Sequence, residues 1–358
     1  MTFKRTDTKK LFVGNVSIGG GSPVRVQTMT KTDTSDIKST LRQIRALTRE
    51  GCEIIRVAVP DMNAAQAIGK LTSASPIPVI ADVHFDWRLA IEAVKRGVSG
   101  LRINPGNIGA RWKLKEVVNA LLDKSIPLRV GVNAGSLEKD LLKKYGHPTP
   151  EALVESAERH ISMLEDMGFS SIKVSLKASN VLSTIQAYRS FAERYSYPLH
   201  IGISEAGPHF SGIIKSSVGL GILLSEGIGD TIRVSLTEEP IEEVRTAYEI
   251  LRSLGLRQRG PELVSCPTCG RCRIDLKGLV RKVEKRLKGI EKPFKVAVMG
   301  CVVNGPGEAK EADIGIAAGK GTGILFRSGR IIKRLKEKDL LDALMKEIQG
   351  QFKITIQR

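Results

Sequence analysis

Residues 78–103, PVIADVHFDWRLAIEAVKRGVSGLRI, contain the pattern that decides the fold. The apolar run Pro78–Val83 is typical of a strand buried on both faces of a parallel sheet. Asp86 stands where it can cap a helix over Trp87–Arg96, and a glycine follows that helix directly. A second apolar run, Gly100–Ile103, comes next. This stretch is therefore predicted to be one strand–helix–strand unit.

The same alternation of short apolar runs and helical patterns fills most of the chain. The predicted strands are Val24–Thr28, Ile54–Val57, Pro78–Val83, Gly100–Ile103, Leu128–Val132, Ser171–Ser175, Leu199–Ile203 and Thr231–Ser235. Eight β/α units over about 240 residues match the size of a TIM barrel, an α/β fold. A doubly wound sheet is the second possibility, but no GxGxxG sequence follows the first strand.

Segments on either side of the eight units predict additional structure. Ahead of them, Leu11–Ser17 and Pro23–Val26 flank three glycines, Gly19 to Gly21, which predicts a β-hairpin that plugs the bottom of the barrel. Residues 255–264 are a predicted linker. We therefore expect a barrel domain over residues 1–258 and a C-terminal domain over residues 259–358.

The C-terminal domain is predicted to be a small α+β unit. Its pattern contains an apolar helical stripe from Leu276 to Leu287, a later helix near Lys338–Ile348 and a last strand at Phe352–Ile356. Three short apolar runs lie between the two helices, at Lys295–Met299, Asp313–Ala317 and Thr322–Phe326.

The charge is strongly positive and unevenly distributed. The chain has 56 Lys and Arg against 38 Asp and Glu, a net charge of +18. Residues 1–260 hold 35 basic and 27 acidic residues, and residues 261–358 hold 21 and 11. The C-terminal part is therefore the more basic per residue. This excess predicts an anionic partner without identifying it.

The composition and the cysteines point to a reducing compartment. No apolar run approaches the ~18 residues that span a membrane, and the charged start lacks the apolar core of a signal peptide. We therefore expect a cytoplasmic protein with no membrane partner, in which thiols stay reduced. Aromatic residues make up only 4%, which argues against stacking platforms for single-stranded nucleic acid.

Several predicted strands contain a single cation within an apolar run. These cations are Arg56, Arg102, Arg129, Lys173 and Arg233. Buried charges persist when they are paired, and the carboxyl ends of barrel strands hold the active site. The nearby carboxylates are Asp82, followed by His84, and Glu205. An internal salt-bridge network is one interpretation. The excess of cations over carboxylates favours a polyanionic ligand, most simply a diphosphate.

Polar residues after these strands belong to the same rim of the predicted barrel. They include Asn104, Asn133, Ser175 and Ser235. Glu205, in the sequence Ile-Ser-Glu-Ala-Gly, is a candidate general acid or base, or else a charge that neutralises an arginine.

Four of the five cysteines lie in one late stretch. Cys266, Cys269 and Cys272 form C-x-x-C-x-x-C, and Cys301 follows in Gly-Cys-Val-Val-Asn-Gly-Pro-Gly-Glu. Such spacing suits an iron–sulfur cluster or a structural zinc ion. Cys52 is interpreted as an inert thiol of the core.

Together these motifs resemble the 4-hydroxy-3-methylbut-2-enyl diphosphate synthases, iron–sulfur enzymes of the non-mevalonate isoprenoid pathway. The resemblance rests on Ile-Ser-Glu205-Ala-Gly, on Cys266-Pro-x-Cys269-Gly-Arg and on the segment from Cys301 to Glu308, and it covers nearly the whole chain. It implies reductive ring opening and dehydration of 2-C-methyl-D-erythritol 2,4-cyclodiphosphate, with electrons from reduced flavodoxin or ferredoxin.

The resemblance also implies roles for particular residues. Glu205 matches the acid/base glutamate, and a [4Fe–4S] cluster would be held by Cys266, Cys269, Cys301 and Glu308. Positions that hold the diphosphate match Arg56, Arg102, Arg129, Asn133, Lys173, Arg233 and Ser235. Asp82, His84 and Ser175 complete the predicted substrate site, and Asn304 would assist from the cluster side. Cys272 is an extra cysteine that could replace Glu308 as a ligand.

The resemblance further implies a head-to-tail homodimer in which the cluster domain of one subunit caps the barrel of the other. Two alternative functions are kept. One is a zinc-stapled basic protein that binds nucleic acid. The other is a phosphate-binding TIM-barrel lyase or transferase with a structural metal domain.

Overall fold

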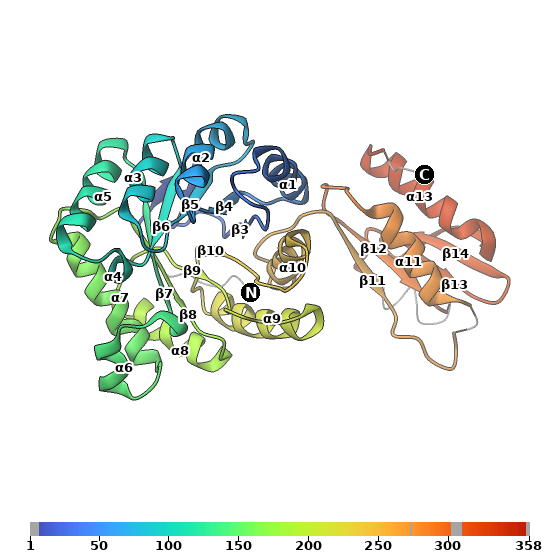
Figure 1. Cartoon of the computed structure of the whole chain (residues 1–358). Helices are drawn as coiled ribbons and strands as arrows, with labels where there is room; N and C mark the ends of the chain where they lie inside the picture. Colours follow the sequence, from blue (N-terminus) through green and yellow to red (C-terminus); the bar gives the residue numbers. More distant parts are fainter. Residues whose placement is uncertain (1–6, 273, 302–309, 356–358) are drawn as a thin grey trace. The chain divides into compact units, whose positions relative to one another are not determined.

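A computed structural model describes residues 7–272, 274–301 and 310–355 of the chain (Figure 1). The chain forms two compact units, Met1–Arg257 and Gln258–Arg358, and each is described by itself. Among the described residues, no helix is long and apolar enough to cross a membrane.

The first unit is built on eight parallel strands in the order β8-β7-β6-β5-β4-β3-β10-β9. The strands are β3 (Arg25–Met29), β4 (Ile54–Ala58), β5 (Val79–Asp82), β6 (Gly100–Ile103), β7 (Leu128–Asn133), β8 (Ile172–Lys177), β9 (His200–Ile201) and β10 (Thr231–Ile232). A parallel bridge between Val174 and Leu199 joins the two ends of this order, so the sheet closes on itself. The predicted TIM barrel and all eight of its strands are confirmed.

Helices surround the sheet on its outer side (Figure 1). They are α1 (Ile37–Glu50), α2 (Met62–Ala74), α3 (Trp87–Lys95), α5 (Arg111–Lys124), α7 (Pro150–Glu165), α8 (Val181–Ala192), α9 (His209–Ser225) and α10 (Pro240–Ser253), with the short α4 (Pro105–Ile108) and α6 (Lys139–Tyr145). The predicted caps are confirmed. Asp86 accepts a hydrogen bond from the Arg88 amide at the start of α3, and Gly97, which follows this helix, has a φ of +87° in the left-handed region.

The hairpin that precedes the barrel exists, but its turn was wrongly predicted. Strands β1 (Leu11–Val13) and β2 (Val16–Ile18) are antiparallel, and the turn is at Gly14, where φ is +57°. The glycines at 19–21 form a separate bend after β2. Two residues suffice to close this hairpin, so the nearer glycine takes the turn.

The hairpin closes the amino-terminal end of the barrel. Leu11, Val13 and Ile18 form one apolar cluster with Ile54 of β4 and Ile80 of β5. This contact agrees with the plug expected from the sequence.

The second unit is a five-stranded sheet in the order β11-β12-β13-β14-β15, with two main helices. The elements are β11 (Pro261–Ser265), α11 (Leu276–Leu287), β12 (Phe294–Met299), β13 (Ile314–Ala318), β14 (Thr322–Arg327), β15 (Arg330–Lys336) and α13 (Leu340–Phe352). The three predicted central strands and both predicted helices are therefore present.

Two predictions for this unit were wrong, and one strand was not predicted. Part of the expected linker is strand β11, and β15 was missed. The expected last strand fails because Phe352 ends α13 and residues 354–355 have no regular structure. β11 and β15 are the two edges of the sheet, and edge strands lack the apolar signal of buried ones.

Candidate functional site

The strand register places four charged side chains in one row. Asp82 of β5 pairs with Arg102 of β6, Arg102 with Arg129 of β7, and Arg129 with Lys173 of β8. Residues paired in register on parallel strands project from the same face of the sheet. All four side chains are at most 5% exposed, so one carboxylate and three cations lie side by side inside the barrel.

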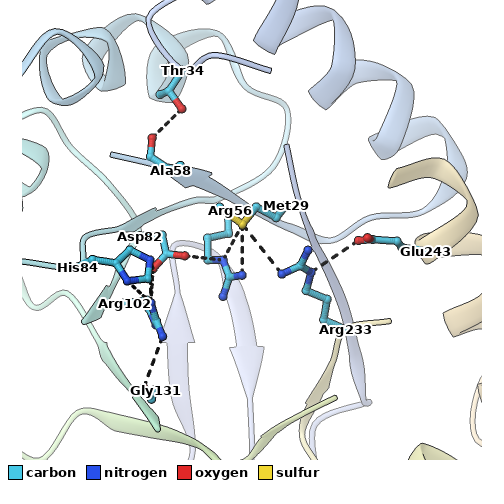
Figure 2. A network of polar contacts seen from close by, with 10 residues as sticks. All are labelled: Met29, Thr34, Arg56, Ala58, Asp82, His84, Arg102, Gly131, Arg233 and Glu243. Atoms are coloured by element: carbon cyan, nitrogen blue, oxygen red, sulfur yellow. Dashed lines mark hydrogen bonds and ion pairs between the residues drawn. The ribbon is translucent and has the colours of Figure 1, made fainter. Parts of the chain in front are cut away.

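Asp82 is the carboxylate that two arginines share (Figure 2). Its two oxygens lie 3.3 Å from Arg56 Nε and 2.9 Å from Arg102 Nη1. Burial acts to raise the pKa of Asp82, but Arg56, a hydrogen bond from His84 and Arg102 outweigh it and hold this pKa well below its usual value. Asp82 therefore stays ionised and fixes both guanidinium groups.

A glycine opposite Arg102 gives its guanidinium room. A Cβ atom added at Gly131 would lie 2.6 Å from Arg102 Nε, closer than packed atoms tolerate. The Gly131 carbonyl also accepts a hydrogen bond of 3.4 Å from Arg102 Nη2 (Figure 2). The bare backbone of β7 at this point is therefore part of the site.

Arg233 has a carboxylate partner that the sequence analysis did not identify. Glu243 of α10 is 1% exposed and lies 3.6 Å from Arg233 Nε (Figure 2). The Met29 sulfur of β3 lies between Arg233 and Arg56, 3.2 Å from Arg56 Nη2 and 4.0 Å from Arg233 Nη1. We expected Glu205 to balance these cations. It is Glu243 that does so, because α10 turns this one acidic side chain inward.

Two cations of the row have no carboxylate of their own among the described residues. Arg129 Nε and Nη1 and Lys173 Nζ are buried atoms with no hydrogen-bond partner in the part of the chain that the structure describes. Burial, Arg129 and Arg56 together lower the pKa of Lys173 to about 7. Burial, Arg56 and Arg102 lower the pKa of Arg129 well below its usual value. These shifts mean that an anionic group would be strongly favoured here.

Lys177 is a further buried cation that the sequence analysis missed. It is 6% exposed at the end of β8, two residues beyond Ser175 on the same face. Burial and the charges of Arg129 and Arg233 lower the pKa of Lys177 well below its usual value. A Cβ atom at Gly202 would lie 2.8 Å from Lys177 Nζ, so this glycine leaves room for the amine. The alternation of Lys173, Ser175 and Lys177 along the chain could have predicted that Lys177 faces the same side of the strand.

Below these cations lie polar atoms that also lack partners in the described structure. Both amide atoms of Gln27 and the Nε2 atom of His200 are buried and unbonded. More than about nine in ten buried polar groups in proteins have a hydrogen-bond partner. The interior of the barrel therefore offers more donors than the described chain uses, as expected for a site that holds an anion and water.

The remaining predicted residues of the barrel lie around its mouth, the end of the barrel formed by the strand carboxyl ends. Ser175 is buried, Asn133 and Ser235 are half-buried, and His84 is 51% exposed. Glu205 is exposed between β9 and α9, and makes no hydrogen bond or ion pair with any described residue.

Glu205 has an unusual backbone. Its φ of +52° lies in the left-handed region, which costs roughly 1–2 kcal/mol for a residue with a side chain. Such strain is found most often at functional positions. The turn thus projects a free carboxylate at the mouth at the expense of local stability.

In the second unit the sheet brings the cysteine segments together. Cys266 directly follows β11, one residue separates Cys301 from the end of β12, and these strands are parallel neighbours. The Gly300 amide donates a 3.3 Å hydrogen bond to the Cys266 sulfur. A Cβ atom at Gly300 would lie 2.8 Å from the Cys272 sulfur and 3.4 Å from that of Cys266. The absence of a side chain at Gly300 thus leaves space for both sulfurs.

The donor set fits a metal centre of the soft-ligand class. Thiolates select iron–sulfur clusters or zinc. Hydrogen bonds from the Arg271 backbone and side chain lower the pKa of the exposed Cys269, which favours its thiolate. Among residues 7–272, 274–301 and 310–355, no three potential ligands already stand together around one point. The predicted residues Asn304 and Glu308 lie outside the described residues.

Comparison with known proteins places the chain among close relatives. The family model described as the GcpE TIM-barrel domain matches residues 8–248, and that of the GcpE protein C-terminal domain matches residues 262–350. The chain is 61% identical to the 4-hydroxy-3-methylbut-2-en-1-yl diphosphate synthase (flavodoxin) of Thermodesulfovibrio yellowstonii, over 97% of this chain and 99% of the relative. It is 60% identical to the protein of that name from Geobacter sulfurreducens, over 96% and 98% of the two chains.

Among solved structures, the Yersinia pestis dihydropteroate synthase is similar in fold. The TM-score is 0.51 at 13% sequence identity, and the match covers 69% of this chain and 97% of that one. At this identity the likeness concerns the barrel architecture alone.

Proposed function

Because the chain belongs to the GcpE family, we propose that it is an oxidoreductase that converts 2-C-methyl-D-erythritol 2,4-cyclodiphosphate to 4-hydroxy-3-methylbut-2-enyl diphosphate. Two electrons and two protons are taken up, one carbon–oxygen bond of the ring breaks, and one water leaves. The observation that carries the proposal is the row of three buried cations across β6, β7 and β8, of which only Arg102 has an ion pair with a described carboxylate. This excess of charge supports a diphosphate ligand rather than a nucleic acid.

The barrel binds the diphosphate in this proposal. Arg129, Lys173 and Lys177 supply donors that no carboxylate of the described chain takes up. Arg56 and Arg102, already oriented by Asp82, present their remaining N–H groups in fixed directions, which lowers the cost of ordering on binding. Arg233, Asn133, Ser175, Ser235 and His84 complete the contacts from the mouth.

Glu205 handles a proton. Its carboxyl group is exposed and unpaired at the mouth, so it can approach the leaving oxygen of a substrate whose phosphates lie deeper. Protonation of that oxygen lets it depart as water, a general acid role. Glu205→Gln is expected to bind substrate normally and to lose turnover by about 10²–10⁴-fold. Weakened binding with unchanged turnover would contradict this role.

The cysteine segments hold the redox centre in this proposal. Cys266, Cys269 and Cys301 would ligate a [4Fe–4S] cluster, with Glu308 as the fourth ligand. When bound, such a cluster supplies electrons one at a time and can leave one iron open to a substrate oxygen. Anaerobic iron and sulfide analysis of Cys272→Ser tests the fourth ligand, with Cys269→Ser as the matched control. If Cys272→Ser keeps its iron and sulfide and Cys269→Ser loses them, Glu308 is supported as the fourth ligand. If both variants lose them, Cys272 is favoured as the fourth ligand.

The full proposal also includes a cytoplasmic head-to-tail homodimer. In it, the barrel of one subunit and the cysteine unit of the other form one active site. Mixed dimers of Glu205→Gln and Cys301→Ser subunits test this arrangement. Recovery of activity on mixing supports sharing between chains, whereas inactive mixed dimers support a site within one chain.

One assay tests the reaction itself. The anaerobically purified protein is incubated with the cyclodiphosphate and dithionite, and the linear diphosphate is measured by mass spectrometry. Formation of this product in proportion to protein-bound iron is expected. A colourless, zinc-containing protein without turnover would contradict the proposal.

A further inference from the structure

The exposed cations of the second unit gather along one side of α11. The helix buries the apolar side chains of Leu276, Val283 and Leu287 in the core of its unit. The other side carries the exposed cations Lys277, Arg281 and Lys285 at four-residue spacing, and the exposed C-cap residue Lys288 follows the helix. These four cations are here named the α11 stripe. Residues at these spacings are neighbours on a helix surface, so the stripe is continuous.

These cations differ from some, though not all, surface cations of the barrel. Arg159, Arg189 and Arg245 of the barrel helices, and Arg194 just after α8, form ion pairs with nearby carboxylates. No member of the α11 stripe forms an ion pair with any residue that the structure describes. The only acidic residue of the helix is Glu284. The stripe therefore presents net positive charge to solvent.

The first cation of the stripe does not stabilise its own helix. Lys277 stands in the first turn, near the positive end of the helix dipole, and that turn has no acidic residue. Lys277, Arg281 and Lys285 are also like charges at four-residue spacing, which disfavours the helix, although the helix dipole favours Lys285 in the last turn. The stability of α11 therefore does not explain the cation at its start.

The stripe begins beside the cysteines. Leu276, the residue before Lys277, has its Cδ2 atom 3.0 Å from where a Cβ of Gly300 would lie, and the Cys272 sulfur is 2.8 Å from the same point. The first turn of α11 thus packs against the segment that leads into Cys301. Lys277, the first cation of the stripe, therefore directly follows a residue that packs beside the cysteines.

We propose that the α11 stripe is the docking surface for an acidic electron-carrier protein of the flavodoxin class. This inference rests on the proposed function, because a redox centre held by the cysteines needs a carrier that approaches it closely. Charge complementarity argues for an acidic partner, since opposite surface potentials steer association and set orientation. The stripe would hold such a carrier beside the cysteines.

The exposed strand β15 is the rival surface. It carries Arg330 and Lys333, which also lack ion pairs among the described residues. However, β15 is separated from β12 by β13 and β14, or about 14 Å at ~4.8 Å per strand spacing. A carrier docked on β15 would therefore lie farther from the cysteines than one on α11.

Two double variants of equal charge change test the proposal. The protein with its cluster is titrated with reduced flavodoxin at low ionic strength, comparing Lys277→Gln/Arg281→Gln with Arg330→Gln/Lys333→Gln. We expect the α11 pair to raise the flavodoxin concentration for half-maximal rate about tenfold and to weaken its salt dependence. The β15 pair should change the flavodoxin concentration for half-maximal rate less than about twofold. Equal effects of the two pairs would overturn the proposal, because net charge alone would then explain them.

Dithionite separates this inference from the proposed reaction. With dithionite as reductant, the α11 pair should turn over at the rate of the parent protein, since no docking is needed. Calorimetric titration with oxidised flavodoxin repeats the comparison without turnover. Absence of dithionite-driven product in the parent protein would overturn the reaction, whereas undiminished flavodoxin binding by the α11 pair would overturn the docking surface.

Discussion

The cations inside the barrel and those of the α11 stripe carry the same charge in opposite surroundings. Arg56, Arg102 and Arg129 are less than 10% exposed, and one carboxylate, Asp82, pairs with the first two of them. Lys277 and Arg281 are exposed and unpaired with described residues. Because the first group is buried, it can bind a ligand only at short range and in a fixed geometry. Because the second group is exposed, it attracts anionic partners over a longer distance, and salt screens this attraction.

The difference shows why net charge is a weak guide to function. Both groups contribute to the same value of +18. Variants of buried cations should change stability and substrate binding strongly and respond little to salt. Variants of exposed cations should change association rates and respond to salt, with little effect on stability. The predictions below test this contrast, from the largest expected effect to the smallest.

Removing the shared carboxylate should have the largest effect. Asp82→Asn leaves Arg56 and Arg102 buried without a counter-charge and is expected to lower the free energy of unfolding by about 3–5 kcal/mol. The folded pKa of Asp82 lies below its unfolded value, so this stabilisation is present at neutral pH and is lost as the pH falls through the folded pKa.

Urea unfolding at several pH values measures this prediction. The difference between the parent and Asp82→Asn should be constant from pH 5 to 7 and shrink below about pH 4. Asp86→Asn, at an exposed helix cap, is the control. A difference independent of pH down to pH 2 would contradict the assignment of charge to Asp82.

Removing an interior cation should separate binding from stability. Arg129→Met is expected to cost about 2–5 kcal/mol of substrate binding, because a buried charged contact is lost. Without substrate, the same change should leave stability unchanged or raise it by up to about 4 kcal/mol, because a buried charge without a full partner is removed. Calorimetry and thermal unfolding measure the two quantities. Loss of stability would show that Arg129 has a structural counter-charge.

Lys173 should make substrate binding depend on pH. Its folded pKa of about 7 lies below the unfolded value, so between pH 7 and about 10 unfolding takes up a proton and stability rises with pH. Binding of an anion favours charged Lys173, so affinity should fall above pH 7 by at most about tenfold per pH unit. Lys173→Arg, which stays charged, should flatten this profile. An unchanged profile in that variant would assign the titration to another group.

The α11 stripe should give the smallest effect on stability. Lys277→Gln removes a cation from the first turn and one like-charge pair, and should raise the free energy of unfolding by a few tenths of a kcal/mol. Urea unfolding at low salt measures this change, and added salt should abolish it. A destabilised variant would contradict the unpaired exposure of Lys277.

Much of the barrel could be predicted because its strands are buried on both sides. The runs around Arg56 and Arg129 are apolar and bounded by helix caps. The apolar pattern and the capping residues therefore predict the same strand boundaries. Edge strands carry no such pattern, which is why β11 and β15 were missed. The hairpin turn was misplaced because Gly14 competes with three later glycines for the same role.

The site was predicted less completely than the fold. Cations within apolar strands are easily recognised as candidate site residues, because a buried charge is unfavourable unless it is paired or binds a ligand. Glu243 lies on an amphipathic helix among other acidic residues, and only tertiary packing turns it toward Arg233. Lys177 was overlooked because the strand was predicted to end at Ser175. The roles of all these residues in substrate binding remain our proposals.

The plugged floor of the barrel determines which end of a ligand goes in first. With Leu11, Val13 and Ile18 packed beneath the strands, the interior is a cup rather than a channel. The buried cations Lys173 and Arg129 lie inside the barrel, whereas Glu205 is exposed at its mouth. In the proposed function, the substrate would therefore enter with its phosphates first and keep its carbon skeleton outermost, where a carbon–oxygen bond can break while the phosphates stay bound.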